Sequence, residues 1–158
     1  MGELICREMG YCSFRVTGRQ DARPQKLWST DMASLTTVDG SQISFDPSAV
    51  TAVADRDADT GDAVTTVYGL TGGRVRITES VHAFLRRIKV EANFGRLTRP
   101  NGTFVWINSK AVISVRPPQD GEYGPDIHAV VSVGTLTQAV KQTPAEVARI
   151  VKAHHGNL

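Results

Sequence analysis

The sequence predicts a mainly β protein of the α+β class, with two small antiparallel β units that are each closed by one helix. The stretch LTTVDGSQISFDPSAVTAV, residues 35–53, returns in modified form as LTRPNGTFVWINSKAVISV, residues 97–115, at a constant spacing of 62 positions. Each copy has an Asp-Gly or Asn-Gly turn between alternating apolar residues, which is typical of a β-hairpin. Further strands and an amphipathic helical pattern follow each copy.

This repetition sets the expected domain organisation. A unit of about 60 residues buries too little surface to be comfortably stable alone, and two such units packed together bury more. We therefore expect a first β-rich repeat at residues 34–94 and a second at residues 95–158, related as a tandem repeat. A flexible N-terminal arm at residues 1–33 precedes them.

Each repeat is expected to open with a hairpin. Ile43 and Phe45 alternate with polar residues after the first turn, and Val105 and Ile107 take the same places in the second copy. Further strands are predicted at AVTAV, AVTTVYGL and RVRIT in the first copy, and at AVISV, HAVVSVGTL and TQAVKQ in the second.

The closing helices have recognisable starts. Thr143 and Glu146 form a capping box, and Pro144 takes the first helical position, where its missing N–H is harmless. In the first repeat the segment TES at residues 78–80 supplies candidate N-caps before an apolar stripe.

The composition excludes several classes of protein. Of the 158 residues 41% are hydrophobic and 22% are charged, so a packed core is expected and a disordered chain is not. The 18 basic and 16 acidic residues give a net charge of +2, too even a balance to demand nucleic acid or an anionic membrane. Because no apolar run could span a bilayer and no signal-peptide pattern is present, we expect a cytoplasmic protein, or a virion protein if the chain is phage-encoded.

The expected arm shows no sustained hydrophobic period and mixes charges with turn formers. Two interpretations stay open: an extension upstream of a natural chain start at Met32, or a segment that docks on a neighbouring subunit through Trp28 and Phe14. Cys6 and Cys12 are neither a disulfide framework nor a paired zinc knuckle, so we expect reduced thiols without a structural role.

The second copy, within RLTRPNGTFVWINSKAVISVRP, has a Leu-Thr strand, an Asn-Gly turn, an apolar strand ending in Asn, and a further apolar strand. The residues that carry this pattern are Leu97, Thr98, Asn101, Gly102, Phe104, Val105, Asn108 and Val112. It resembles the opening of the small flagellar and swarming-motility proteins. The first copy is similar to that family's passage into its helix, through Val67, Leu70, Gly73, Glu79, Ser80 and Val81. The resemblance implies a small, non-catalytic accessory or assembly protein, and tandem β units also suit bacteriophage structural or accessory proteins by analogy of architecture.

A second pattern supports an alternative function. Phe94, Arg96 and Arg99, followed by Asn108, resemble the Phe-x-Arg-x-x-Arg hallmark and Val-Asn of LytTR-type DNA-binding domains. The resemblance implies that Arg96, Arg99 and Asn108 contact DNA. Residues 95–158 carry 7 basic and 4 acidic groups, against 6 and 8 in residues 32–94, so the second repeat has the charge that phosphate contacts need.

Other chemistry is weakly signalled. Asp55, Asp57 and Asp59 alternate as in a calcium loop, but Gly61 comes one residue late and Thr66 stands where a bidentate Glu is needed. The four histidines have no second ligand at metal spacing, and no nucleophile–base arrangement or phosphate loop is present. We therefore predict no enzymatic activity, no metal and no cofactor.

Function is expected to lie in contact with a protein partner, which includes a second copy of the chain. The strands AVTAV and HAVVSV lack the charge or proline that protects an edge strand, so they are expected to pair with each other or with a neighbour. Trp106 alternates with Val105 and Ile107, so its side chain is expected to be an exposed contact anchor or to be covered by the other repeat. The candidate partner-binding residues are Trp106, Trp28 and Tyr123, the last in the stiff loop RPPQDGEYGPD.

Overall fold

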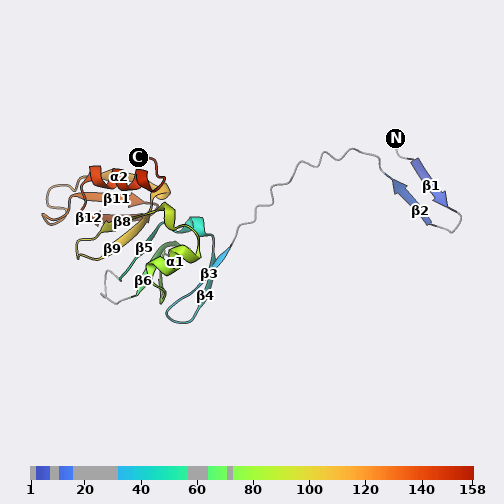
Figure 1. The fold of residues 1–158 in the computed structure, drawn as a ribbon, viewed down its shortest axis with the longest axis horizontal. Coiled ribbons are helices and arrows are strands. Elements are labelled where there is room, and N and C mark those ends of the chain that lie inside the picture. The colour runs from blue at the N-terminus through green and yellow to red at the C-terminus, as the bar shows by residue number, and fades with distance from the viewer. Residues whose placement is uncertain (1–2, 8–10, 16–31, 57–63, 71–72) are drawn as a thin grey trace.

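The computed structural model describes residues 3–7, 11–15, 32–56, 64–70 and 73–158. The described part of the chain is mainly β, with antiparallel sheets and two α-helices, as the α+β prediction requires (Figure 1). Within these residues, neither helix is long and apolar enough to cross a membrane.

Near the N-terminus, within the expected arm, the chain contains a hairpin. Strands β1 (Glu3–Arg7) and β2 (Tyr11–Arg15) pair antiparallel, with Cys6 opposite Cys12. The sequence did not indicate this hairpin, because strands of five residues are too short to give a sustained period of two.

The first half of the folded chain, from β3 to α1, contains a hairpin, a 3₁₀ turn, three strands and a helix. Its elements are β3 (Ala33–Thr36), β4 (Gln42–Phe45), η1 (Pro47–Ala49), β5 (Ala52–Ala54), β6 (Thr65–Leu70), β7 (Gly73–Ile77) and α1 (Val81–Arg87).

The second half follows the short η2 (Glu91–Asn93) and has the same order of elements. They are β8 (Phe94–Thr98), β9 (Phe104–Asn108), η3 (Ser109–Ala111), β10 (Val112–Arg116), β11 (Ala129–Val133), β12 (Leu136–Val140) and α2 (Pro144–Ala153). The predicted strand and helix positions are therefore present in both halves.

The register of the strands recurs along with their order. Leu35 lies opposite Ile43 in the first hairpin, and Leu97 lies opposite Val105, each 62 residues later, in the second. Both tight turns contain a glycine with positive φ, at 87° in Gly40 and 82° in Gly102, a conformation that glycine adopts without a steric penalty.

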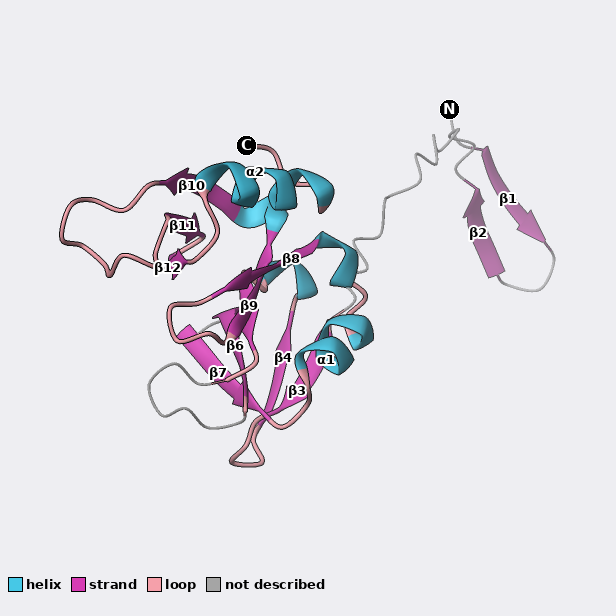
Figure 2. Cartoon of the chain, turned by 60° about the vertical axis from the view of Figure 1, so that its left-hand side comes forward, coloured by secondary structure: helices cyan, strands magenta, loops and turns pink. Residues whose placement is uncertain are grey.

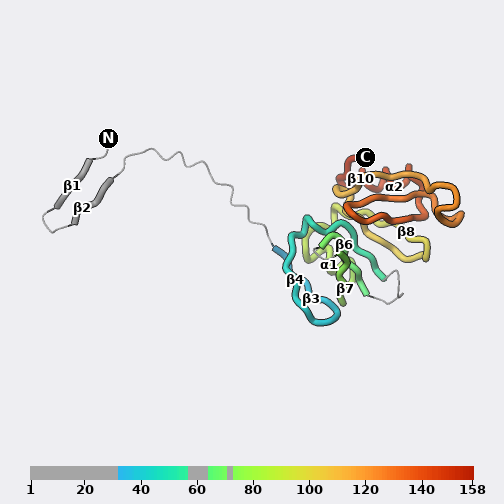
Figure 3. Tube along the Cα trace, turned by 180° about the vertical axis from the view of Figure 1, so that it is seen from behind, coloured from blue at the N-terminus to red at the C-terminus, as the bar shows by residue number. Residues whose placement is uncertain are grey.

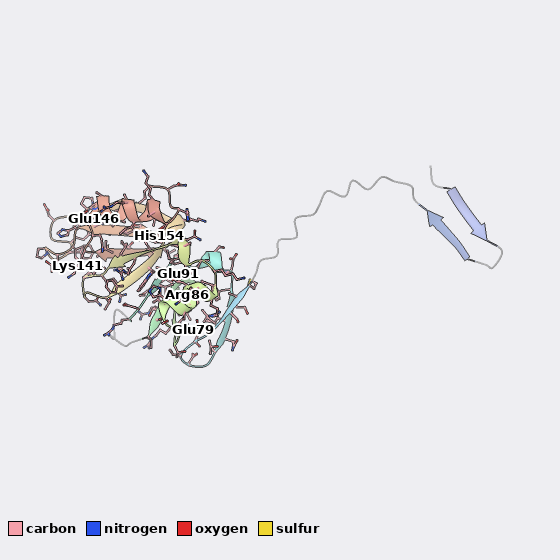
Figure 4. The ribbon with its side chains drawn as sticks, viewed as in Figure 1. Glu79, Arg86, Glu91, Lys141, Glu146 and His154 are labelled. Carbon is pink, nitrogen blue, oxygen red and sulfur yellow. The ribbon has the colours of Figure 1, made fainter. Side chains whose placement is uncertain are left out.

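Local caps also occupy matching positions. Asp46 Oδ1 accepts a hydrogen bond from Ser48 N at 2.8 Å, and Asn108 Oδ1 accepts one from Lys110 N at 3.1 Å. Ser80 caps α1, and Thr143 forms the predicted capping box with Glu146. Figure 4 labels Glu146 on α2. The cap at Ser80 confirms the choice of the TES segment as the helix start.

One sheet joins the two halves. Its strand order is β7-β6-β5-β9-β8, so the second hairpin extends the meander of the first half (Figure 2). The expected boundary at residues 94/95 therefore separates two units that share a continuous sheet, and it falls inside β8.

Two hydrophobic cores lie on opposite faces of this sheet. Because side chains alternate along a strand, Val53 of β5 enters the first core while Ala52 and Ala54 enter the second. Trp106 of β9 enters the first core, whereas Val105 and Ile107 enter the second. Each half thus contributes side chains to the core of the other.

Candidate functional site

The joint between β5 and β9, which we call the seam, is the best-defined contact between the halves. It is an antiparallel ladder with the pairs Ala52–Ile107, Val53–Trp106 and Ala54–Val105. Further hydrogen bonds extend the ladder at both ends: Asn108 N donates to Thr51 O at 2.8 Å, and Phe104 N donates to Asp55 Oδ1 at 3.1 Å. The seam therefore combines backbone pairing with side-chain support.

Two other strands hold positions that correspond to the seam strands, but they lack an equivalent partner among the described residues. By the spacing of 62, β4 corresponds to β9 and β10 corresponds to β5. Among the described residues β4 pairs only with β3, and β10 pairs only with β11. We call the side of β4 that faces away from β3, and the side of β10 that faces away from β11, the open edges.

The backbone groups along the first open edge point away from the hairpin. Thr37 N donates to Ser41 O at 2.9 Å, which fixes the direction of alternate residues in β4 toward β3. The amide of Ser44 therefore faces outward, and the Ser44 side chain is exposed. The corresponding amide in β9 is that of Trp106, which faces β5.

The second open edge carries an exposed apolar side chain. Ile113 lies at a register shift in β10 and is 67% exposed. The corresponding residue in the first half is Thr51, and a Cβ built on Gly134 of the second half would lie 2.9 Å from Thr51 Cγ2. The position that the other half covers at the seam is thus uncovered at the open edge.

The strands predicted to be edges are central ones, so that prediction was wrong. AVTAV overlaps β5, which lies between β6 and β9, and HAVVSV contains β11, which lies between β10 and β12. Their lack of charge reflects burial on both faces, because Ala52, Val53, Ala54, Val131 and Val133 are all 0% exposed.

Trp106 is part of the core. Its side chain is 8% exposed and packs with residues of the first half, with the His82 ring 5.4 Å away in an edge-on arrangement. The expectation of an exposed contact anchor is therefore wrong, and residues of the first half cover Trp106. Trp28 lies outside the described residues.

Tyr123 is 41% exposed on the loop between β10 and β11. It borders a hollow of about 360 Å³ that Arg99, Asn101 and Gln138 also line. The loop is held by an ion pair, because Arg116 donates to both carboxylate oxygens of Glu122, at 2.6 and 2.7 Å. This hydrogen bonding, together with the amide of Gln119, lowers the pKa of Glu122 from 4.5 to about 2.

The three residues of the DNA-binding alternative are all engaged within the chain. Arg99 is 2% exposed and donates to Thr103 Oγ1 and to the carbonyl of Arg56, both at 2.9 Å. The guanidinium of Arg96 lies 4.7 Å from the centre of the Phe104 ring. Asn108 Nδ2 donates to Val50 O at 3.1 Å, across the seam. Only Arg96 among the three is exposed.

The candidate calcium loop lies largely outside the described residues, since residues 57–63 are not described. Asp55 is described, and its carboxylate accepts the Phe104 amide. In the described ranges there is no group of three or more His, Cys, Asp or Glu side chains that could hold a metal ion.

Comparisons with known proteins bring no relative to this chain. No family model matches it, and no curated protein and no solved structure matches it either. The open edges are therefore the features on which a function can be argued. Sequence reasoning missed them because a strand's partners are set by chain segments far away in sequence.

Proposed function

We propose that this chain is a non-catalytic assembly module, a tandem of two related β units that binds other proteins through the open edges of β4 and β10. The matching order of elements, the matching hairpin register and the matching caps support the tandem relationship. A role in a motility apparatus or in a bacteriophage particle fits this proposal through the resemblances of the sequence. The corresponding location is the cytoplasm or a virion.

The observation that carries the proposal is the contrast between the seam and the open edges. The same strand positions are paired between the halves and unpaired, among the described residues, at the ends. Unpaired N–H and C=O groups along a strand can accept a further strand, and pockets for alternate side chains then give specificity. An open edge whose strand corresponds in position to a seam strand is suited to forming the same kind of strand pairing with another protein.

Site-specific photo-crosslinking in the native cells tests this function. A photoreactive amino acid is placed at Ser44 in β4 or at Ile113 in β10, which are both exposed, and at Arg149, an exposed residue of α2, as the control. Discrete cross-linked products at Ser44 and Ile113 that are absent at Arg149 are expected. If neither edge position gives a discrete product, the assembly role is wrong.

A further inference from the structure

The seam supplies a template for a joint between molecules. Resting on the proposed assembly function, we propose that β10 of one copy of this chain pairs antiparallel with β4 of a second copy. The partner is therefore the chain itself, joined head to tail.

The register of this joint follows from the seam. In each of the three seam pairs, the β5 residue is replaced by the residue 62 positions later and the β9 residue by the residue 62 positions earlier. The resulting pairs across the two copies are Ser114–Phe45, Val115–Ser44 and Arg116–Ile43. The outward amide of Ser44 then takes the role that the Trp106 amide has within the chain. Likewise, the Asp46 amide would donate to the carbonyl of Ile113, as Asn108 N donates to Thr51 O.

The exposed side chain of Ile113 fits this arrangement. At the seam, the corresponding residue Thr51 is approached by the turn that contains Gly134. A second copy placed by the same relationship brings its first half against Ile113. Burial of an apolar side chain that is 67% exposed in the single chain favours the joint.

Net charge favours the head-to-tail orientation over like-with-like pairing. Residues 32–94 carry 6 basic and 8 acidic groups, and residues 95–158 carry 7 basic and 4 acidic groups. A joint of β10 with β4 brings the net positive half of one copy to the net negative half of the next. Opposite charges speed encounter and suppress the symmetric alternatives.

The joint is weaker than the seam, for identifiable reasons. Pro117 stands where Asp55 stands at the seam, so the amide and the carboxylate that bond Phe104 there have no counterpart. Asp46 stands in place of Asn108, whose side-chain amide donates across the seam. Ser44 replaces the large buried ring of Trp106. Association is therefore reversible and depends on protein concentration.

The placement of the two open edges makes the contact heterologous. Strand β10 and helix α2 lie at one end of the folded body, and β3, β4 and α1 lie at the other (Figures 2 and 3). A contact between different patches leaves one open edge at each end of a dimer, so it continues to a ring or to an open filament.

Two variants, each blocking one edge, test the proposal by mass. Ser44→Pro removes the outward amide of β4, with Ser44→Ala as the matched control that keeps it. Ile113→Glu puts a carboxylate beside Asp46 of the next copy, with Ile113→Thr as the control because Thr51 has this place at the seam. The mass distribution of each purified full-length chain is measured by sedimentation velocity over a concentration series, with circular dichroism to verify folding.

The wild type and both controls are expected to increase in mass with concentration, and each blocked variant is expected to keep the mass of one chain. An equimolar mixture of the two blocked variants retains one intact β10 and one intact β4, so it is expected to reach twice that mass and no more. A wild type that stays at the mass of one chain overturns the proposal. So does either blocked variant that still dimerises alone, since it would be pairing like with like.

A cross-link reports the register independently, in case Ser44→Pro does not fold. In a background with Cys6→Ser and Cys12→Ser, the double variant Ser44→Cys, Val115→Cys is expected to form a disulfide-linked ladder on oxidation, whereas each single variant is not. Links only between identical positions, or a 44–115 link confined to single chains, contradict the head-to-tail joint. If the purified chain is monomeric while photo-crosslinking captures a different protein, the self-association fails and the assembly function stands.

Discussion

Val53 of the first half lies directly opposite Trp106 of the second half in one antiparallel ladder. Both side chains enter the core of the first half. This pair shows how the chain is held together: a strand of one half completes the sheet of the other, and its largest side chain fills the neighbouring core. The two halves depend on each other for burial as well as for backbone pairing.

Replacement of Trp106 with Ala is expected to destabilise the fold by about 3–5 kcal/mol, because it leaves a cavity in a packed core. The conservative Trp106→Phe is expected to cost less, since it keeps most of the apolar volume. Urea unfolding followed by circular dichroism measures both. A loss below about 1 kcal/mol for Trp106→Ala would mean that the ring is not in the core.

Substitution of Arg99 is expected to destabilise the fold more than substitution of Arg96 in the same unfolding assay, although both residues belong to the pattern that resembles LytTR-type domains. Arg99→Ala is expected to cost about 1–3 kcal/mol, because its partners, Thr103 Oγ1 and the Arg56 carbonyl, lose their hydrogen bonds. Arg96→Ala removes an exposed cation–π contact and is expected to cost about 0.5–1 kcal/mol.

The same two variants address the DNA-binding alternative. The wild type is expected to give no sub-micromolar complex with duplex DNA at physiological salt in fluorescence anisotropy. A tight complex that the double variant Arg96→Ala, Arg99→Ala weakens, with a flatter salt dependence in a still-folded protein, would favour the DNA-binding alternative over the assembly function.

The loop between β10 and β11 is expected to respond to acid through Glu122. Because Arg116 lowers the pKa of Glu122 to about 2, the ion pair stabilises the folded loop fully above the ordinary value of 4.5. That contribution declines as the pH falls from 4.5 and is lost through about pH 2. A carboxyl NMR titration is expected to place the Glu122 midpoint near 2, with a return toward 4.5 in Arg116→Ala. A normal midpoint in the wild type would show that the pair does not form.

Local features were predictable from the sequence. The spacing of 62 gave the positions of the strands, and the pattern from Thr143 to Glu146 gave the start of α2, because turns and caps depend on residues a few positions apart. The alternation that turned Trp106 away from Val105 and Ile107 was also correct.

The partners of these elements were not predictable. Period-two alternation says that Trp106 points to the other face, but only the sheet order shows that the first half covers that face. For the same reason the sequence indicated unprotected edges at β5 and β11, although each of these strands lies between two others. Arg99 matched a DNA-binding pattern, yet it follows β8 at a turn where its side chain reaches back to the carbonyl of Arg56. Such contacts between distant segments leave no local signature.

Amide hydrogen exchange of Ser44 and Trp106, followed by NMR, tests the central claim most directly. The two amides hold corresponding places, one on the open edge of β4 and one in the seam. In dilute protein the Trp106 amide is expected to exchange slowly and the Ser44 amide rapidly, and at high concentration the Ser44 amide is expected to become protected as copies join. Protection of Ser44 in the dilute single chain would contradict the account, because its edge would then be covered within the molecule. Rapid exchange of Ser44 in assembled protein would contradict it equally, because the copies would then be joined elsewhere.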